Sequence, residues 1–155
     1  MKTTAIRHAT LVYARRSEVW RAIATAEGWN GWFTSECTLE PYPGGVFRPV
    51  WRGFGADRTD TQDEGRVVEI RAPDRIVLEW HPEGATTVFT MSLARDGEDT
   101  RLELVDDGYP DETEADRARL LSCACGWGEA LTLLKHYVEY DIGYVPRDDE
   151  ADVTR

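Results

Sequence analysis

The side chains that could carry out chemistry in this sequence are few, and they form no familiar catalytic pattern. His8, His81 and His136 are widely separated, and no cysteine or carboxylate completes a metal-ligand set around any of them. The sequence has no Gly-x-Ser-x-Gly elbow, phosphate-binding loop or dinucleotide fingerprint. We therefore predict no catalytic residue, no metal site and no cofactor.

Four ionisable side chains could still move a proton if they point into a cavity: Arg48, Glu64, His81 and Asp106. An exposed histidine is the more common finding at a strand end such as that of His81. Asp106 lies beside Asp107 in an acidic stretch that favours a solvated turn, whereas a catalytic carboxylate pair would have to be buried. The sequence therefore favours exposed positions for His81 and Asp106.

The three cysteines form no disulfide framework, because their number is odd. Cys123 and Cys125 are two residues apart on a predicted helix, so their side chains point in different directions and cannot readily pair. Cys37 stands alone. We predict three free thiols in a protein of a reducing compartment.

These groups must be positioned by one long helix, which the sequence predicts for residues 114–140. At 1.5 Å per residue it would extend roughly 40 Å, enough to cross a small domain. Thr113 and Asp116 have the spacing of a capping pair at its start, and Gly143 and Pro146 are expected to end it. Its apolar stripe, with intervals of three and four residues, consists of Leu120, Ala124, Trp127, Leu131, Leu134 and Val138.

Two glycines flank Trp127 in the middle of this helix. Gly126 and Gly128 would each cost about 1 kcal/mol relative to alanine in a helix interior. They could make room for a ligand or a kink beside Trp127, or they could allow close backbone packing while Trp127 is buried against a sheet. The sequence leaves both interpretations open.

The segments before the long helix are predicted to be mainly strands. A first strand at 6–13 precedes two short helices, and tight turns connect the later strands, which indicates antiparallel pairing. The later strands are expected at 37–40, 46–51, 65–70, 75–81, 86–94 and 100–105. Residues 52–63 have no hydrophobic periodicity and are predicted to be a mobile loop.

Composition excludes several classes of function. The 155 residues include 29 acidic and 18 basic side chains, a formal charge of −11, which disfavours binding to nucleic acids or anionic membranes. No apolar segment reaches the length of a membrane span, and no signal peptide is recognisable at the start. We expect a cytoplasmic protein with one domain at 1–146 and an acidic, disordered tail at 147–155.

The order of these elements and several local motifs resemble the START-like, or SRPBCC, helix-grip superfamily. Within it, the chain is most similar to the branch named for the activator of the heat-shock-protein ATPase. The similarity extends over roughly residues 3–140. The motifs that carry it are Val19-Trp20, Trp32-Phe33, Pro43-Gly44-Gly45-Val46-Phe47, Gly65-Arg66-Val67-Val68-Glu69-Ile70, Pro73-Asp74-Arg75-Ile76-Val77-Leu78-Glu79-Trp80, Thr100-Arg101-Leu102 and Gly126-Trp127 with Leu131.

The resemblance implies an α+β protein in which a curved antiparallel sheet of about seven strands, in the order β-α-α-β6-α, wraps around the C-terminal helix. It also implies an apolar cavity between them. This branch often has a histidine before a Gly-aromatic pair ahead of the last helix, where this sequence has Asp106-Asp107-Gly108-Tyr109. No role of that histidine can be transferred to this chain.

The aromatic interior leads to the main hypothesis, that the protein binds a small hydrophobic molecule in this cavity. Ligand pockets typically have a volume of ~300–1,000 Å³. A cyclase or aromatase acting on polyketides is one alternative, and a co-chaperone-type interaction module is another. A homodimer and a chaperone partner remain open. The residues predicted to line the cavity, unless they are ordinary core, are Trp32, Phe47, Trp51, Trp80, Phe89, Met91, Trp127 and Leu131.

Overall fold

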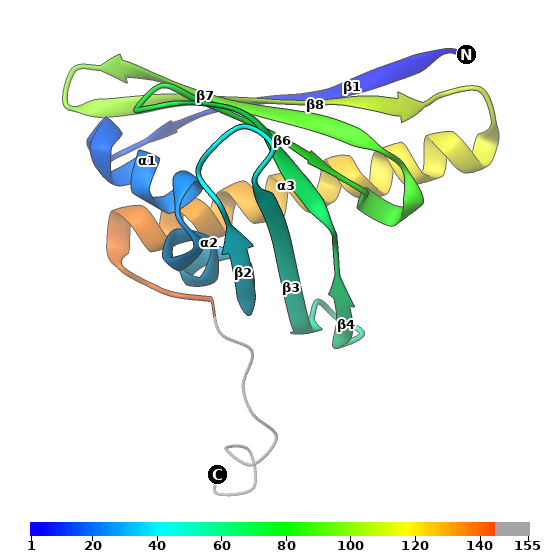
Figure 1. Ribbon diagram of the computed structural model, residues 1–155, viewed down its shortest axis with the longest axis horizontal. Helices are drawn as coiled ribbons and strands as arrows, with labels where there is room; N and C mark the ends of the chain where they lie inside the picture. Colours follow the sequence, from blue (N-terminus) through cyan, green and yellow to red (C-terminus); the bar gives the residue numbers. More distant parts are fainter. Residues whose placement is uncertain (145–155) are drawn as a thin grey trace, which may run out of the picture.

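The computed structural model describes residues 1–144, in which one antiparallel sheet curves over one long helix (Figure 1). The sheet order is β1-β8-β7-β6-β5-β3-β2, and β4 pairs with β3 outside this path. The helices are α1 (Arg16–Ala24), α2 (Ala26–Trp32), the short 3₁₀ helix η1 (Pro82–Gly84) and α3 (Glu114–Tyr140). The strands are β1 (Thr3–Val12), β2 (Glu36–Leu39), β3 (Val46–Phe54), β4 (Thr59–Gln62), β5 (Gly65–Arg71), β6 (Arg75–Trp80), β7 (Thr87–Asp96) and β8 (Asp99–Pro110).

The α+β helix-grip architecture predicted from the sequence is therefore confirmed. One part of the prediction was wrong, because residues 52–63 are not simply a loop. β3 continues to Phe54, and after a turn β4 pairs back against it through Trp51 and Thr61. The polar side chains of β4 are exposed, so its sequence has no apolar alternation to reveal a strand.

The long helix forms where its apolar stripe predicts it. The capping box is present: Thr113 Oγ1 accepts the backbone N–H of Asp116 at 3.0 Å, and Asp116 Oδ2 accepts that of Thr113 at 3.1 Å. The helix ends at Tyr140, followed by Asp141 in a left-handed conformation. Glycine is the usual residue at this left-handed position after a helix, and here Asp141 takes it. Gly143 therefore does not end the helix as predicted. Pro146 lies outside the described residues.

The core lies between α3 and the inner face of the sheet, and the side chains of alternate strand residues fill it. In β7, Thr87, Phe89, Met91 and Leu93 are buried while their neighbours are less so, which is the two-residue period of a half-buried strand. From α3, Trp127, Ala130, Leu131 and Leu134 are the buried residues. The sheet thus positions one row of side chains from each strand against the helix.

The two short helices close one end of this core. The indole N–H groups of Trp29 and Trp32 donate to the carbonyl oxygens of Ile23 and Ala22, each at 2.8 Å. Both tryptophans are fully buried. These hydrogen bonds tie α2 to α1.

The predicted tail at 147–155 lies outside the described residues. Within the described residues, no helix combines the length and apolarity that crossing a membrane requires.

Candidate functional site

A small apolar pocket opens between α3, η1 and the inner face of the sheet. Its volume is about 60 Å³. Most of its walls are aromatic or aliphatic, and none of the residues that line it is basic. The lining residues are Phe33, Trp80, Pro82, Tyr109, Cys123, Gly126, Trp127 and Ala130. We call this the inner pocket.

A buried carboxylate lies directly behind the wall of the inner pocket. Asp106 Oδ2 accepts hydrogen bonds from Tyr109 Oη at 2.6 Å, from Trp127 Nε1 at 2.9 Å and from Trp80 Nε1 at 3.3 Å. All three donors belong to side chains that line the pocket. Strands β6 and β8 and helix α3 therefore converge on one oxygen atom.

Asp106 is fully buried, so the predicted solvated turn was wrong. β8 continues past Val105 to Pro110, and Asp106 pairs there with Ile6 of β1 and Phe89 of β7. The sequence contained a signal for this: Leu102, Leu104 and Asp106 are spaced by two and therefore share the inner face of a strand. The exposed residue is its neighbour, Asp107.

A bulge brings Tyr109 onto the same face. The register between β1 and β8 shifts from Ile6–Asp106 to Thr4–Tyr109, so β8 has one residue more than β1 in this interval. Gly108, with a φ of +115°, provides the backbone conformation that this irregularity requires. Strict alternation would turn Tyr109 outward, and the bulge instead places its hydroxyl against Asp106.

Three polar atoms around Trp80 are buried without a hydrogen-bond partner among the described residues. They are Asp106 Oδ1, Thr87 Oγ1 and Trp51 Nε1. Thr87 is paired with Trp80 across β6 and β7, and the rings of Trp51 and Trp80 have centroids 6.4 Å apart. Unpaired polar groups inside a protein are costly and mark sites that a ligand or water can satisfy.

Two ionisable groups in the pocket wall are held in their neutral form. Burial, followed by the negative charge of Asp106, raises the pKa of Tyr109 far above its usual value. Burial also raises the pKa of Cys123 to about 12, and the hydrogen bond from its Sγ to Glu83 Oε2, at 3.0 Å, adds to the shift. Glu83 itself is exposed, on η1 at the edge of the pocket.

Gly126 forms part of the pocket wall on α3. A Cβ atom added to Gly126 or Gly128 would meet no atom within 4 Å. Close backbone packing therefore does not explain these glycines, although Trp127 between them is buried as expected. Of the two glycines, Gly126 is the one that lines the inner pocket.

The eight residues predicted to line a cavity come together in the core. Trp80 and Trp127 line the inner pocket, with their ring centroids 5.3 Å apart. Trp51 lies beside Trp80, and Phe89 packs against both Trp80 and Trp127 at 4.9 and 5.2 Å. The remaining four, Trp32, Phe47, Met91 and Leu131, are buried in the surrounding core. Mutual packing of these large side chains leaves the inner pocket smaller than the expected cavity.

The other predicted ionisable candidates lie away from the inner pocket. Arg48 and Glu64 form a partly exposed ion pair at 2.8 Å. His81 Nδ1 is 2.8 Å from Asp63 Oδ1, and 39% of the His81 side chain is exposed. Of the four candidates, Asp106 alone is buried behind the pocket wall.

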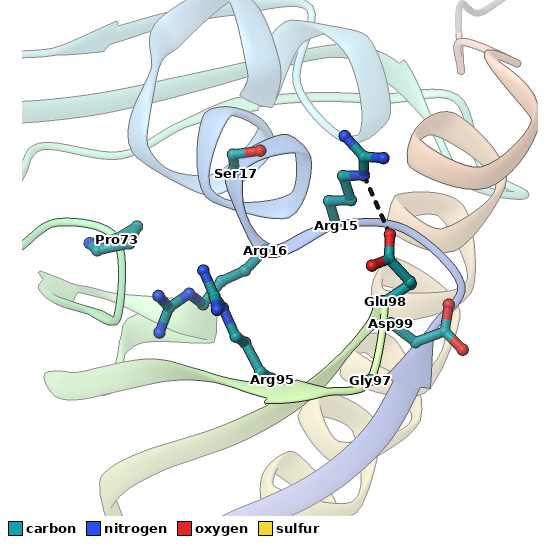
Figure 2. A pocket seen from close by; sticks show the side chains of 8 residues that line it. All are labelled: Arg15, Arg16, Ser17, Pro73, Arg95, Gly97, Glu98 and Asp99. Carbon is teal, nitrogen blue, oxygen red and sulfur yellow. Dashed lines mark ion pairs between the residues drawn. The ribbon is translucent and has the colours of Figure 1, made fainter.

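A larger hollow of about 310 Å³ lies on the outside, between the start of α1 and the hairpin of β7 and β8. Figure 2 shows Arg16, at the start of α1, and Arg95, on β7, among the side chains that line it. Arg15 pairs with Glu98 at 3.4 Å, and Arg16 pairs with Asp74 at 2.7 Å. We call this charged, open hollow the outer pocket.

A curved antiparallel sheet closed over a long C-terminal helix, with a pocket between them, defines a protein of the helix-grip class. The chain belongs to the family of Activator of Hsp90 ATPase homolog 1-like proteins, whose model matches residues 13–139. The resemblance inferred from the sequence is thereby confirmed. No curated protein matches the chain.

Solved structures of similar fold come from several sources. CalU16 from Micromonospora echinospora has a TM-score of 0.73 at 23% identity, and the match covers 95% of this chain and 72% of CalU16. The Aha1 dimer from Colwellia psychrerythraea has a TM-score of 0.70 at 16% identity, covering 90% and 99%. DynU16, from the dynemicin biosynthetic locus, has a TM-score of 0.71 at 24% identity. The match covers 90% of this chain but only 48% of DynU16, so this chain spans about half the length of DynU16. At these identities the likeness concerns the fold.

Proposed function

We propose that this protein binds a small hydrophobic molecule in the inner pocket. The observation that carries the proposal is an open apolar pocket lined on α3 by the exposed Gly126, whose missing side chain leaves open space at the mouth of the pocket. Glycine in a helix interior lowers stability, so a glycine that relieves no close contact favours an open space. Ligand sites are typically apolar hollows with a few placed polar groups, and Asp106 and Tyr109 are such groups here.

The size of the pocket limits what can bind. Its volume of about 60 Å³ accommodates a small group or one end of a longer molecule. A larger ligand of the kind expected from the sequence would need Trp80, Trp127 or η1 to move. We therefore propose that the protein takes a small ligand, or the end of an amphiphile whose remainder extends out past Gly126.

Toluene provides a direct test with a neutral apolar probe. Its binding would be followed by the shifts of the indole N–H signals of Trp80 and Trp127 in ¹⁵N-labelled protein, with the signals of Trp29 as internal reference. The variant Gly126→Leu is expected to lower the affinity for toluene at least tenfold, because the new side chain occupies the pocket.

Gly128→Leu is the matched control, since it places the same side chain on the same helix without filling the inner pocket. Its affinity for toluene is expected to stay within twofold of that of the parent protein. Absence of binding to the parent, or equal losses in both variants, would contradict the proposed site.

A cyclase-type enzyme is a second candidate, favoured by one observation. Tyr109 Oη, in the pocket wall, lies 2.6 Å from Asp106 Oδ2 behind it, so this pair could exchange a proton with a bound substrate. Turnover of a polyketide-type substrate that is lost in Asp106→Asn, while toluene still binds, would support this candidate. Unchanged turnover in that variant would remove it.

The interaction-module alternative rests on the family and on the fold shared with a dimeric Aha1 protein. We propose a homodimer and a chaperone ATPase as partners to be tested by sedimentation and by ATPase stimulation. A monomer that leaves the hydrolysis rate of the ATPase unchanged would exclude both.

A further inference from the structure

Two acidic side chains, Asp106 and Glu83, form hydrogen bonds with residues that line the inner pocket. Asp106 is buried directly behind three of the lining side chains, and Glu83 contacts a fourth, Cys123, at the edge. No basic residue lines the pocket, and within residues 1–144 no ion pair to Asp106 is formed. Arg119, one turn before Cys123 on α3, pairs with Asp116 at 3.3 Å, and its Nε is buried without a hydrogen-bond partner among the described residues.

The walls of the pocket are suited to a cation. Phe33, Trp80, Tyr109 and Trp127 provide four aromatic rings, whose faces carry partial negative charge and attract organic cations at close range. The indole N–H groups of Trp80 and Trp127 and the hydroxyl of Tyr109 all donate to Asp106. Donation to a carboxylate shifts electron density into these rings, which strengthens their attraction for a positive charge.

The carboxylate also has unused capacity as an acceptor. Its Oδ2 receives three hydrogen bonds, whereas Oδ1 is buried and has no partner among the described residues. A buried carboxylate is normally paired with a cation, because burial of an isolated charge is costly. The three donors compensate only part of that cost, so a positive charge arriving in the pocket would be stabilised by Asp106.

We propose that the ligand of the inner pocket is an organic ammonium ion, whose cationic head lies among the four aromatic rings and is neutralised by Asp106. This inference rests on the proposed function and names the class of molecule that the same pocket takes. An apolar tail would extend outward along Gly126. The overall charge of −11 would further raise the local concentration of cations.

Three amphiphiles of equal length test this preference: n-hexylammonium, 1-hexanol and hexanoate, each titrated at neutral pH and constant ionic strength. Binding would be read from the indole N–H signals of Trp80 and Trp127. We expect n-hexylammonium to bind at least tenfold more tightly than 1-hexanol and hexanoate to bind most weakly. An ionic strength at or above the physiological value screens attraction by the acidic surface as a whole.

Two variants with the same change in net charge separate the buried carboxylate from that general surface effect. Asp106→Asn removes the charge behind the pocket, whereas Asp107→Asn removes the charge of the adjacent, exposed residue. The preference for n-hexylammonium over 1-hexanol is expected to fall at least fivefold in Asp106→Asn. It is expected to remain within twofold of the parent value in Asp107→Asn.

The outcomes distinguish this inference from the proposed function. If 1-hexanol binds as tightly as n-hexylammonium, or if Asp106→Asn keeps the full preference, the ammonium inference is overturned while apolar binding stands. If toluene and all three amphiphiles fail to bind, both fall. Should Asp106→Asn fail to fold, the comparison of the three ligands on the parent protein still decides the sign of charge that the pocket prefers.

Discussion

The inner and outer pockets differ in nearly every property that matters for binding. The outer pocket has about five times the volume, but two of its arginines are already in ion pairs at the surface, Arg15 with Glu98 and Arg16 with Asp74. The inner pocket is small, yet its walls are aromatic, and a fully buried carboxylate, Asp106, lies behind them. Exposed ion pairs are worth little, whereas a buried, desolvated charge acts strongly on whatever approaches it.

This difference teaches that volume alone does not identify a binding site. The inner pocket differs in having three features that lower the stability of the fold. These are a buried charge, unpaired polar atoms and a glycine in a helix interior. The outer pocket shows none of these features. Changes in the two pockets should therefore have effects of very different size.

The largest effect is expected at Asp106. In Asp106→Ala, the buried donors of Trp80, Tyr109 and Trp127 lose their common acceptor, so the free energy of unfolding should fall by about 3–5 kcal/mol. Urea denaturation followed by tryptophan fluorescence would measure it. The matched variant Asp107→Ala should change stability by no more than about 0.5 kcal/mol. Equal effects at both positions would remove the distinction between the buried and the exposed carboxylate.

The second effect concerns the two thiols of α3. Since burial raises the pKa of Cys123 to about 12, only roughly one molecule in a thousand carries its thiolate at pH 9. Iodoacetamide should therefore modify exposed Cys125 first, and the rate at Cys123 should rise steeply between pH 9 and 12. Peptide mass spectrometry would measure both rates. Equal rates at pH 9 would show that the inner pocket does not shield Cys123.

Because the pKa of Cys123 is raised on folding, the folded state favours the neutral thiol. Its contribution to stability is complete below pH 9, the ordinary value for the free thiol, and is lost as the pH rises towards 12. Buried Cys37, whose pKa burial also raises to about 12, acts in the same direction. The urea midpoint of unfolding should therefore be lower at pH 11 than at pH 8. The difference between the two midpoints should be smaller in Cys123→Ala than in the parent protein.

The third effect compares glycines. Gly126→Ala and Gly128→Ala should each raise the free energy of unfolding by about 0.5–1 kcal/mol, because the new methyl group meets nothing and the helix is favoured. Gly28→Ala should instead destabilise, since its Cβ would clash with the backbone carbonyl oxygens of Arg21 and Ala22. Thermal unfolding would measure all three. A loss of stability in Gly126→Ala would show that the wall of the inner pocket is already filled.

The smallest effects are expected in the outer pocket. Arg15→Ala removes an ion pair in which 75% of the Arg15 side chain is exposed, so stability should change by less than about 0.5 kcal/mol. Arg95→Ala should leave the affinity for toluene within twofold. A tenfold loss of toluene affinity in either variant would transfer the proposed site from the inner to the outer pocket.

The sequence by itself determined the elements and their faces. Intervals of three and four residues located α3, Thr113 and Asp116 located its start, and alternation located β6 and β7. These features depend on local spacing, which the sequence displays directly. β4 was missed because its four residues are polar and exposed, and pairing with β3 is what defines it as a strand.

Only the tertiary structure decided the chemistry of the pocket. The two-residue spacing of Leu102, Leu104 and Asp106 fits a strand with Asp106 facing the core. An acidic pair before a glycine fits a solvated turn equally well. The local pattern could not decide between the buried strand position and the turn. The choice was made by pairing with β1 and β7 and by two indole groups and a phenol that three separate elements bring to one oxygen. A buried charge is stable only where such distant donors meet, and their meeting is a property of the fold.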